Sequence, residues 1–198
     1  MNANAANVEI AGPEGRHDNR SLLRHATRSA HDRAEQRWSD VPGNAHEMAT
    51  FLNAMLSLHL EFGLTAARSV DPHGALELEH ERLAALRVDL EVAPPTEPAP
   101  ASATRMHHHT AWGTLYALNG SALGATVLMR QSPETIGAST RYLELMSGFV
   151  RSGALGTFFR ALNRQKLDMH RAASGATAVF AAMAEQAPGA PGAPAGTG

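Results

Sequence analysis

Apolar residues recur every three or four positions along most of this chain, which is the spacing of amphipathic helices. No stretch alternates apolar and polar residues over the length of a strand, and β-branched residues are few. The pattern predicts an all-α fold. We expect long helices over residues 20–38, 46–70, 75–90, 105–130 and 154–185, with shorter helical segments opening at 132 and covering 140–150.

Proline and glycine interrupt the helical pattern at a few places. The sequences at 41–44 (VPGN) and 71–74 (DPHG) predict turns. Four prolines within 93–103 predict a loop, because interior prolines break helices. Neither half of the chain alone has enough apolar residues for its own core. The predicted organisation is therefore a disordered tail at 1–17, a single helical domain at 18–186 and a disordered Ala/Pro/Gly tail at 187–198.

Composition narrows the classes of function. The chain has 198 residues, no cysteine and a formal net charge of −2. The absence of cysteine excludes disulfides, thiolate metal sites and cysteine nucleophiles, and it fits a cytoplasmic protein. We expect no nucleic-acid partner, since there is no strong positive field. We also expect no secretory signal and no membrane span, since the N-terminus lacks the required pattern and no apolar run is long enough.

The predicted first helix carries a histidine that could ligate a metal. His31 falls on the apolar face of this helix, so we expect its ring to point inward. Glu35 follows one turn later, and a ligating histidine commonly donates its second N–H to such a carboxylate. The same spacing also fits a structural histidine in the core that is hydrogen-bonded to Glu35 and ligates no metal. Arg24 and Arg28 lie on or near the same side, where they could hold acidic groups of a cofactor.

The predicted helix over 105–130 contains three glycines, Gly113, Gly120 and Gly124, along one face. Each lowers helix stability by roughly 1 kcal/mol relative to alanine. Either a flat cofactor lying on the helix or a closely packed second helix would explain them.

A basic pair, Arg160 and Arg164, lies one turn apart on the predicted last helix. The two guanidinium groups could bind carboxylates through charge-assisted hydrogen bonds. The spacing of the pair also fits an ordinary solvated face.

Together these stretches resemble the heme oxygenase family. Residues 26–35, ATRSAHDRAE, are similar to the family's proximal helix, where A-T-[KR]-x-x-H-x-x-x-E carries the iron-ligating histidine. Residues 116–125, YALNGSALGA, are similar to the bacterial form of the distal helix, usually Y-V-L-E-G-S-x-L-G-G. The two motifs occur in the family's order, and the resemblance covers about residues 20–180.

The resemblance implies a role for each matching residue. His31 would be the proximal heme ligand and Glu35 the residue that orients it. The residues expected near the heme propionates are Arg24, Arg28, Arg160 and Arg164, and those expected on the distal side are Tyr116, Gly120, Ser121 and Gly124.

The resemblance also implies the fold, a single-domain heme oxygenase-like multi-helix bundle, and the reaction. Heme b would be both cofactor and substrate, and O2 with external electrons would cleave it to biliverdin, carbon monoxide and ferrous iron. A ferredoxin-like or flavin-dependent reductase would donate the electrons, because nothing in the sequence suggests a bound flavin or nicotinamide. A photoreceptor that accepts the bilin is a further candidate partner.

Departures from the family pattern keep other functions open. The distal segment lacks the aspartate of many members, Asn119 replaces the usual glutamate and Ala125 replaces a glycine. A non-enzymatic heme-binding protein for storage, transfer or sensing is the main alternative. A third possibility is a related helical fold with a di-iron or thiamin-type site, although the acidic residues near histidines, Glu47, Glu61 and Glu81, do not form two matching ligand sets.

Overall fold

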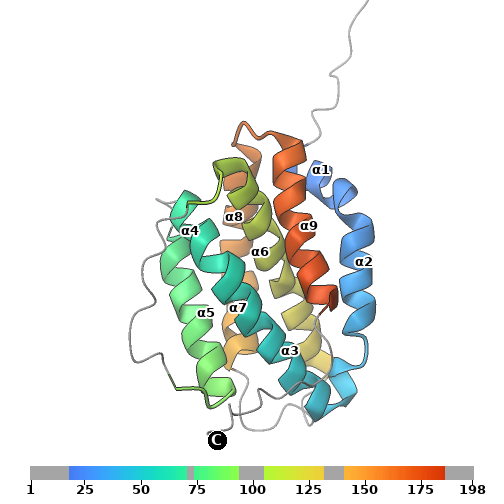
Figure 1. Ribbon diagram of the computed structural model, residues 1–198. Coiled ribbons are helices and arrows are strands. Elements are labelled where there is room, and N and C mark those ends of the chain that lie inside the picture. Colours follow the sequence, from blue (N-terminus) through green and yellow to red (C-terminus); the bar gives the residue numbers. More distant parts are fainter. Residues whose placement is uncertain (1–17, 71–73, 94–104, 132–140, 186–198) are drawn as a thin grey trace, which may run out of the picture.

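The computed structural model describes residues 18–70, 74–93, 105–131 and 141–185, and this part of the chain is all helical (Figure 1). The fold class is therefore the predicted one. The α-helices are α1 (Asn19–Ala26), α2 (Arg28–Arg37), α3 (Ala45–Leu58), α4 (Leu64–Val70), α5 (Ala75–Asp89), α6 (His108–Gln131), α7 (Arg141–Arg151), α8 (Ala154–Asn163) and α9 (Met169–Glu185). A short 3-10 helix covers Val41–Gly43, and a π-helical turn covers His59–Gly63 between α3 and α4.

Helix α6 is the centre of the bundle and packs against α4, α7, α8 and α9. Helix α9 packs on one side of α6 and also against α2 (Figure 1). The core has two parts, and α6 contributes to both. The larger part includes Met55, Leu118 and Met146, and the smaller includes Leu23 and Trp112.

The close packing of α6 on α9 explains one of the three glycines in α6. A Cβ on Gly113 would collide with the backbone carbonyl of Ala172. On the opposite helix, a Cβ on Gly175 would collide with the carbonyl of Thr110. These glycines let the two backbones touch, whereas Gly120 and Gly124 have no such neighbour.

Two predicted helices are interrupted. The helix expected over 20–38 breaks at Thr27, whose hydroxyl donates to the carbonyl of Leu23 at 2.8 Å, and so divides into α1 and α2. The helix expected over 154–185 divides into α8 and α9. Asp168 caps α9, because its side chain accepts hydrogen bonds from the backbone N–H groups of His170 and Arg171. The apolar periodicity does not indicate this break. Arg160 and Arg164 therefore lie at α8 and not on the last helix.

Several expectations lie outside the described residues: both tails, most of the proline-rich loop and the short helix at 132. Within the described ranges, none of the helices has both the length and the apolar character needed to cross a membrane.

Candidate functional site

His31 lies at the edge of the buried stripe of α2 and not within it. Its side chain is 49% exposed, while its neighbour Ala30 and Ala34 one turn on are buried. The expectation that the ring points inward was wrong, because the stripe is narrow and its small alanines, not the histidine, pack on α9. The ring keeps an apolar neighbour, the ring of Phe180 on α9, in a T-shaped arrangement with 5.2 Å between centroids.

Two carboxylates flank one nitrogen of this ring. His31 Nδ1 lies 3.7 Å from Asp32 Oδ1 and 3.7 Å from Glu35 Oε2. Both distances are too long for a direct hydrogen bond, so the carboxylates act by charge or through a water molecule. Ligand atoms of the three residues lie within 4.8 Å of one another. The ring thus has an acidic side at Nδ1, which favours the tautomer with the proton there and leaves Nε2 as the ligating nitrogen.

Tyr116 connects α6 to the first helices. Its hydroxyl lies close enough to Thr27 to interact with it, and the charges of Arg20 and Arg24 lie close enough to act on it. Burial raises the pKa of Tyr116, and the two arginines and Thr27 oppose the rise. The tyrosine therefore remains a neutral phenol near two positive charges.

This contact sets the register between the two helices. The chain through α1 and α2 and the chain through α6 run in the same direction, from the top of Figure 1 downwards. His31 is one turn beyond Thr27, since its N–H donates to the Thr27 carbonyl. Gly120 is one turn beyond Tyr116 along α6. His31 and Gly120 thus lie at the same level of the bundle, on helices that both pack against α9.

One face of α6 beyond Tyr116 is uncovered. Among the described residues, and apart from the backbone of α6 itself, no heavy atom lies within 4 Å of where a Cβ of Gly120 or Gly124 would be. Leu123 and Val127 on the same face are 46% and 48% exposed, which is high for large apolar side chains. We call these four residues the open face of α6. It presents an apolar surface on which a flat ligand can approach the backbone.

Four exposed arginines lie on α1 and in or directly after the C-terminal half of α8, two helices that pack on each other. Asn19 fixes this junction by donating to the carbonyls of Leu162 and Gln165 at 2.8 and 2.9 Å. The guanidinium of Arg20 lies 4.1 Å above the Phe159 ring. The cluster, which we call the basic edge, comprises Arg20, Arg24, Arg160 and Arg164. All four are exposed, and in the described part of the chain none pairs with a carboxylate.

The sequence predicted Arg24, Arg160 and Arg164 as site residues but not Arg20. Only the packing of α1 on α8 brings Arg20 next to α8. Arg28 is exposed at the start of α2. Arg160 also donates to Thr157 at 2.8 Å, so its guanidinium folds back along α8.

A buried polar cluster lies on another side of α6. The side chains of His59, Glu79 and Arg82 are at most 1% exposed. His59 Nδ1 lies 2.6 Å from Glu79 Oε2, and Arg82 donates to the other oxygen of Glu79 and to Asn119 Oδ1. His59 Nε2 lies 3.1 Å from the hydroxyl of Tyr142.

Electrostatics holds Glu79 ionised in this cluster. Burial alone would raise the pKa of Glu79, but the charges of His59 and Arg82 and their hydrogen bonds outweigh it and lower the pKa from 4.5 to about 2. Burial also raises the pKa of Tyr142 well above its ordinary value, so this phenol stays protonated.

The local backbone is shaped to hold the cluster. His59 begins the π-helical turn that Gly63 ends, and π turns are frequent at functional sites. A Cβ on Gly63 would collide with Glu79 Oε2. The sequence alone indicates only a structural or surface role for His59. The sequence does contain an indication of this cluster on α5. Glu79 and Arg82 occupy the same helical stripe as the buried Leu83 and Leu86, which indicates charged side chains within the core.

Ser121 lies between the open face and this cluster. It is half-buried, and its hydroxyl donates to the carbonyl of Leu118 at 2.7 Å. Asn119, in contrast, points away from the open face and is buried against Arg82.

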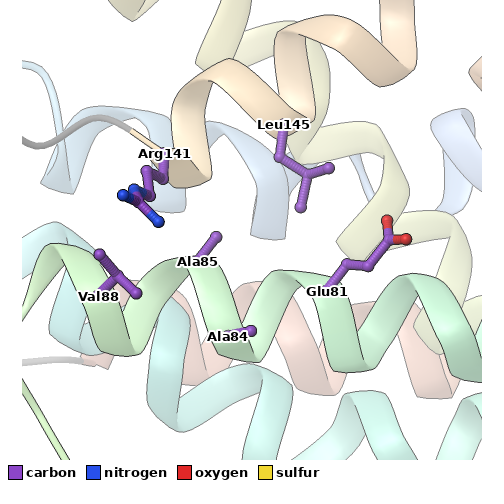
Figure 2. Close-up of a pocket in the computed structure, with 6 residues that line it drawn as sticks. All are labelled: Glu81, Ala84, Ala85, Val88, Arg141 and Leu145. Atoms are coloured by element: carbon purple, nitrogen blue, oxygen red, sulfur yellow. The ribbon is translucent and has the colours of Figure 1, made fainter.

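Two cavities lie away from His31 and the open face, and the second is lined in part by Glu79, Arg82 and Asn119 of the buried polar cluster. One, of about 350 Å³, is a shallow hollow between α5 and α7, with Glu81 and Arg141 at opposite ends (Figure 2). The other, of about 620 Å³, lies between α5, α6 and α8 and is lined by residues such as Trp112, Leu115 and Phe158. Neither contains a residue that the sequence predicted for the site.

The carboxylates considered for a di-iron site do not form inward-facing ligand sets. Glu61 and Glu81 are exposed, and Glu47 pairs with Arg37 at 3.3 Å. The described residues thus provide no matching sets of metal ligands in the bundle core. Comparison with known proteins adds no assignment, since no family model and no curated protein matches this sequence.

Proposed function

We propose that this protein is a heme oxygenase that binds heme between His31 and the open face of α6. The observation that carries the proposal is the register between these helices. His31 and Gly120 each lie one turn beyond the Thr27–Tyr116 contact, which places an available imidazole level with an uncovered, apolar, glycine-rich face. The resemblance of both segments to the proximal and distal helices of that family supports the same assignment.

The residues present fit heme. His31 offers a half-exposed ring with carboxylates at Nδ1, an arrangement that fixes a ligating tautomer. The open face lets a macrocycle lie against the backbone, because Gly120 and Gly124 have no side chains. The basic edge supplies guanidinium groups for two propionates. The ring of Phe180, beside His31, adds an apolar contact.

Bound there, heme would supply both the iron that activates dioxygen and the ring that is cleaved. The protein's part is to hold one orientation and to exclude water from the apolar face. His31 would hold the iron, the basic edge would hold the propionates, and Tyr116 would be a neutral hydrogen-bond donor near Arg20 and Arg24. Biliverdin, carbon monoxide and ferrous iron are the proposed products, and a ferredoxin-like or flavin-dependent reductase is the proposed electron donor.

A specific observation favours one competing function, heme binding without turnover. Helix α6 contains neither aspartate nor glutamate from residue 108 to 131, so the open face has no carboxylic acid of its own. A protein that stores, transfers or senses heme would need none.

Aerobic reduction separates the two functions. We expect the hemin-loaded protein, given ascorbate in air with catalase present, to lose its Soret band while biliverdin absorption grows and carbon monoxide is released. Catalase excludes degradation by free peroxide. A Soret band that persists after reduction, with no bilin formed, would instead establish the heme-binding function.

A further inference from the structure

The acidic side of His31 has the arrangement of a small chelating group on α2. Residues three or four apart on a helix are neighbours, so Asp32 and Glu35 meet each other and Glu35 meets His31 on one patch of its surface. His31 Nδ1 lies 3.7 Å from Asp32 Oδ1 and 3.7 Å from Glu35 Oε2, and the three ligand atoms lie within 4.8 Å of one another. Elsewhere in the described ranges, no three histidine or acidic side chains converge in this way.

These separations are close to those of ligands that share one metal ion. Nitrogen and oxygen ligands lie about 2.1 Å from zinc, so two ligands at a tetrahedral angle are about 3.4 Å apart. The two distances from Nδ1 are only slightly longer than this. The side chains of Asp32 and Glu35 are 63% and 75% exposed, so rotation of either can close the remaining gap without disturbing the core.

The charges of both carboxylates are available to a ligand. Arg28 and Arg33 lie on the same helix, yet within the described residues neither Asp32 nor Glu35 forms an ion pair with an arginine or lysine. Both carboxylates instead lie beside the imidazole of His31. That ring packs against Phe180 in a T-shaped arrangement, which limits how far it can turn away from them.

The mixed donor set selects the class of cation. Imidazole suits zinc, iron, nickel and copper ions, whereas magnesium and calcium are bound by oxygen ligands. Three protein ligands also leave positions on the ion for water. We propose that His31 Nδ1, Asp32 and Glu35 form a binding site for a divalent first-row metal ion such as Zn²⁺.

A cation in this site would keep His31 from ligating heme, a consequence that rests on the proposed function. A neutral imidazole has a lone pair on one nitrogen and a proton on the other. When Nδ1 ligates the cation, its proton moves through solvent to Nε2, which then has no lone pair for heme iron. When Nε2 ligates heme, Nδ1 keeps its proton and cannot hold the cation. The two metals are therefore alternative ligands of His31.

The first test uses the heme-free protein and zinc chloride, so it can be read even if heme does not bind. Nitrogen-15 NMR of the histidine rings is expected to show a saturable shift of His31 Nδ1, while Nε2 retains its proton. Magnesium at the same concentration should leave the ring unchanged. The site is overturned if zinc does not change His31, if Nε2 is the nitrogen that binds, or if magnesium has an equal effect.

Removing one carboxylate at a time tests the other two ligands. Asp32→Asn and Glu35→Gln keep the size of each side chain and remove its charge. We expect each variant to bind zinc at His31 about tenfold or more weakly, since the loss of even an outer partner of a metal site costs roughly 10- to 100-fold in affinity. Both residues are exposed, so thermal unfolding should match that of the wild type. Unchanged zinc affinity in both variants overturns the site.

Helix α5 supplies a matched control. His80 and Glu81 are adjacent and exposed, as His31 and Asp32 are, but the position four residues after His80 is Ala84. This patch lacks the third ligand. Glu81→Gln should therefore leave zinc binding at His31 unchanged.

Competition with hemin tests the exclusion. Zinc at ten times its own Kd should weaken hemin binding to the wild type by up to about tenfold, because a competitor acts through the factor 1 + [L]/Kd. The same zinc concentration should weaken it by only about twofold in Glu35→Gln, whose zinc affinity is about tenfold lower. Hemin affinity that does not respond to zinc overturns the exclusion. Zinc binding at His31 without hemin ligation leaves the cation site and contradicts the proposed function, and hemin ligation without zinc binding does the reverse.

Discussion

Replacing Glu79 by glutamine lowers the free energy of unfolding by about 3 kcal/mol or more, which is the size expected when one partner of a buried ion pair is removed. Glu79 is 0% exposed and accepts from both His59 and Arg82. Without its charge, the guanidinium of Arg82 has no counter-ion in the core. Urea denaturation at neutral pH measures the loss. Glu81→Gln on the same helix is the matched control, since Glu81 is exposed and should change stability by less than about 0.5 kcal/mol.

The same carboxylate makes stability depend on pH. The pKa of Glu79 is lowered from 4.5 to about 2 in the folded protein, so its contribution is complete above about pH 4.5 and is lost as the pH falls toward 2. The difference corresponds to about 3 kcal/mol, at 1.36 kcal/mol per pKa unit. We expect wild-type stability to decline more steeply than that of Glu79→Gln across this acid range. Parallel acid dependences would show that Glu79 is not held ionised by its neighbours.

Filling the open face is expected to abolish most hemin binding without harming the fold. In Gly124→Leu the new side chain meets no atom within 4 Å of its Cβ, so the heme-free protein accommodates it. Leucine also favours the helix over glycine by roughly 0.5–1 kcal/mol. The side chain would occupy the volume proposed for the macrocycle, and overpacking of about 1–3 kcal/mol corresponds to a loss of roughly 5- to 150-fold in affinity. Titration with hemin and thermal unfolding measure the two effects.

Gly148→Leu is the control for this change. Gly148 also has open space at its Cβ, but it lies on α7 on the same face as the exposed residues Glu144 and Arg141. We expect its affinity for hemin to equal that of the wild type. Equal affinity in Gly124→Leu would show that heme does not lie on the open face.

Local pattern predicted the helices well but not their interruptions. The apolar periodicity is the same on both sides of Thr27 and of residues 164–168, so it cannot show where a threonine hydroxyl or an aspartate cap ends a helix. The inward orientation predicted for His31 failed for a related reason. Periodicity places a residue on a stripe, but the stripe's width depends on how closely α9 approaches.

The predicted site residues are partly brought together. The charge of Arg24 acts on Tyr116, and Gly120 and Gly124 share an uncovered face. The buried hydrogen bonds that link Glu79, His59 and Tyr142 were not predicted, because these residues come from α5, the π turn and α7, and no spacing within one helix connects them. By resemblance, Asn119 replaces a glutamate of the family's distal helix. In the structure its amide lies in the core and accepts a hydrogen bond from Arg82.

The most direct test of the central claim is the ferric absorption spectrum of the hemin complex, compared between wild type and His31→Ala. We predict that His31→Ala binds hemin more weakly, with a shifted Soret band, and that free imidazole restores the wild-type spectrum by replacing the lost ligand. His25→Ala, an exposed histidine on α1, serves as the control and should match the wild type. Identical ferric spectra for wild type and His31→Ala would contradict the assignment of His31 as the heme ligand.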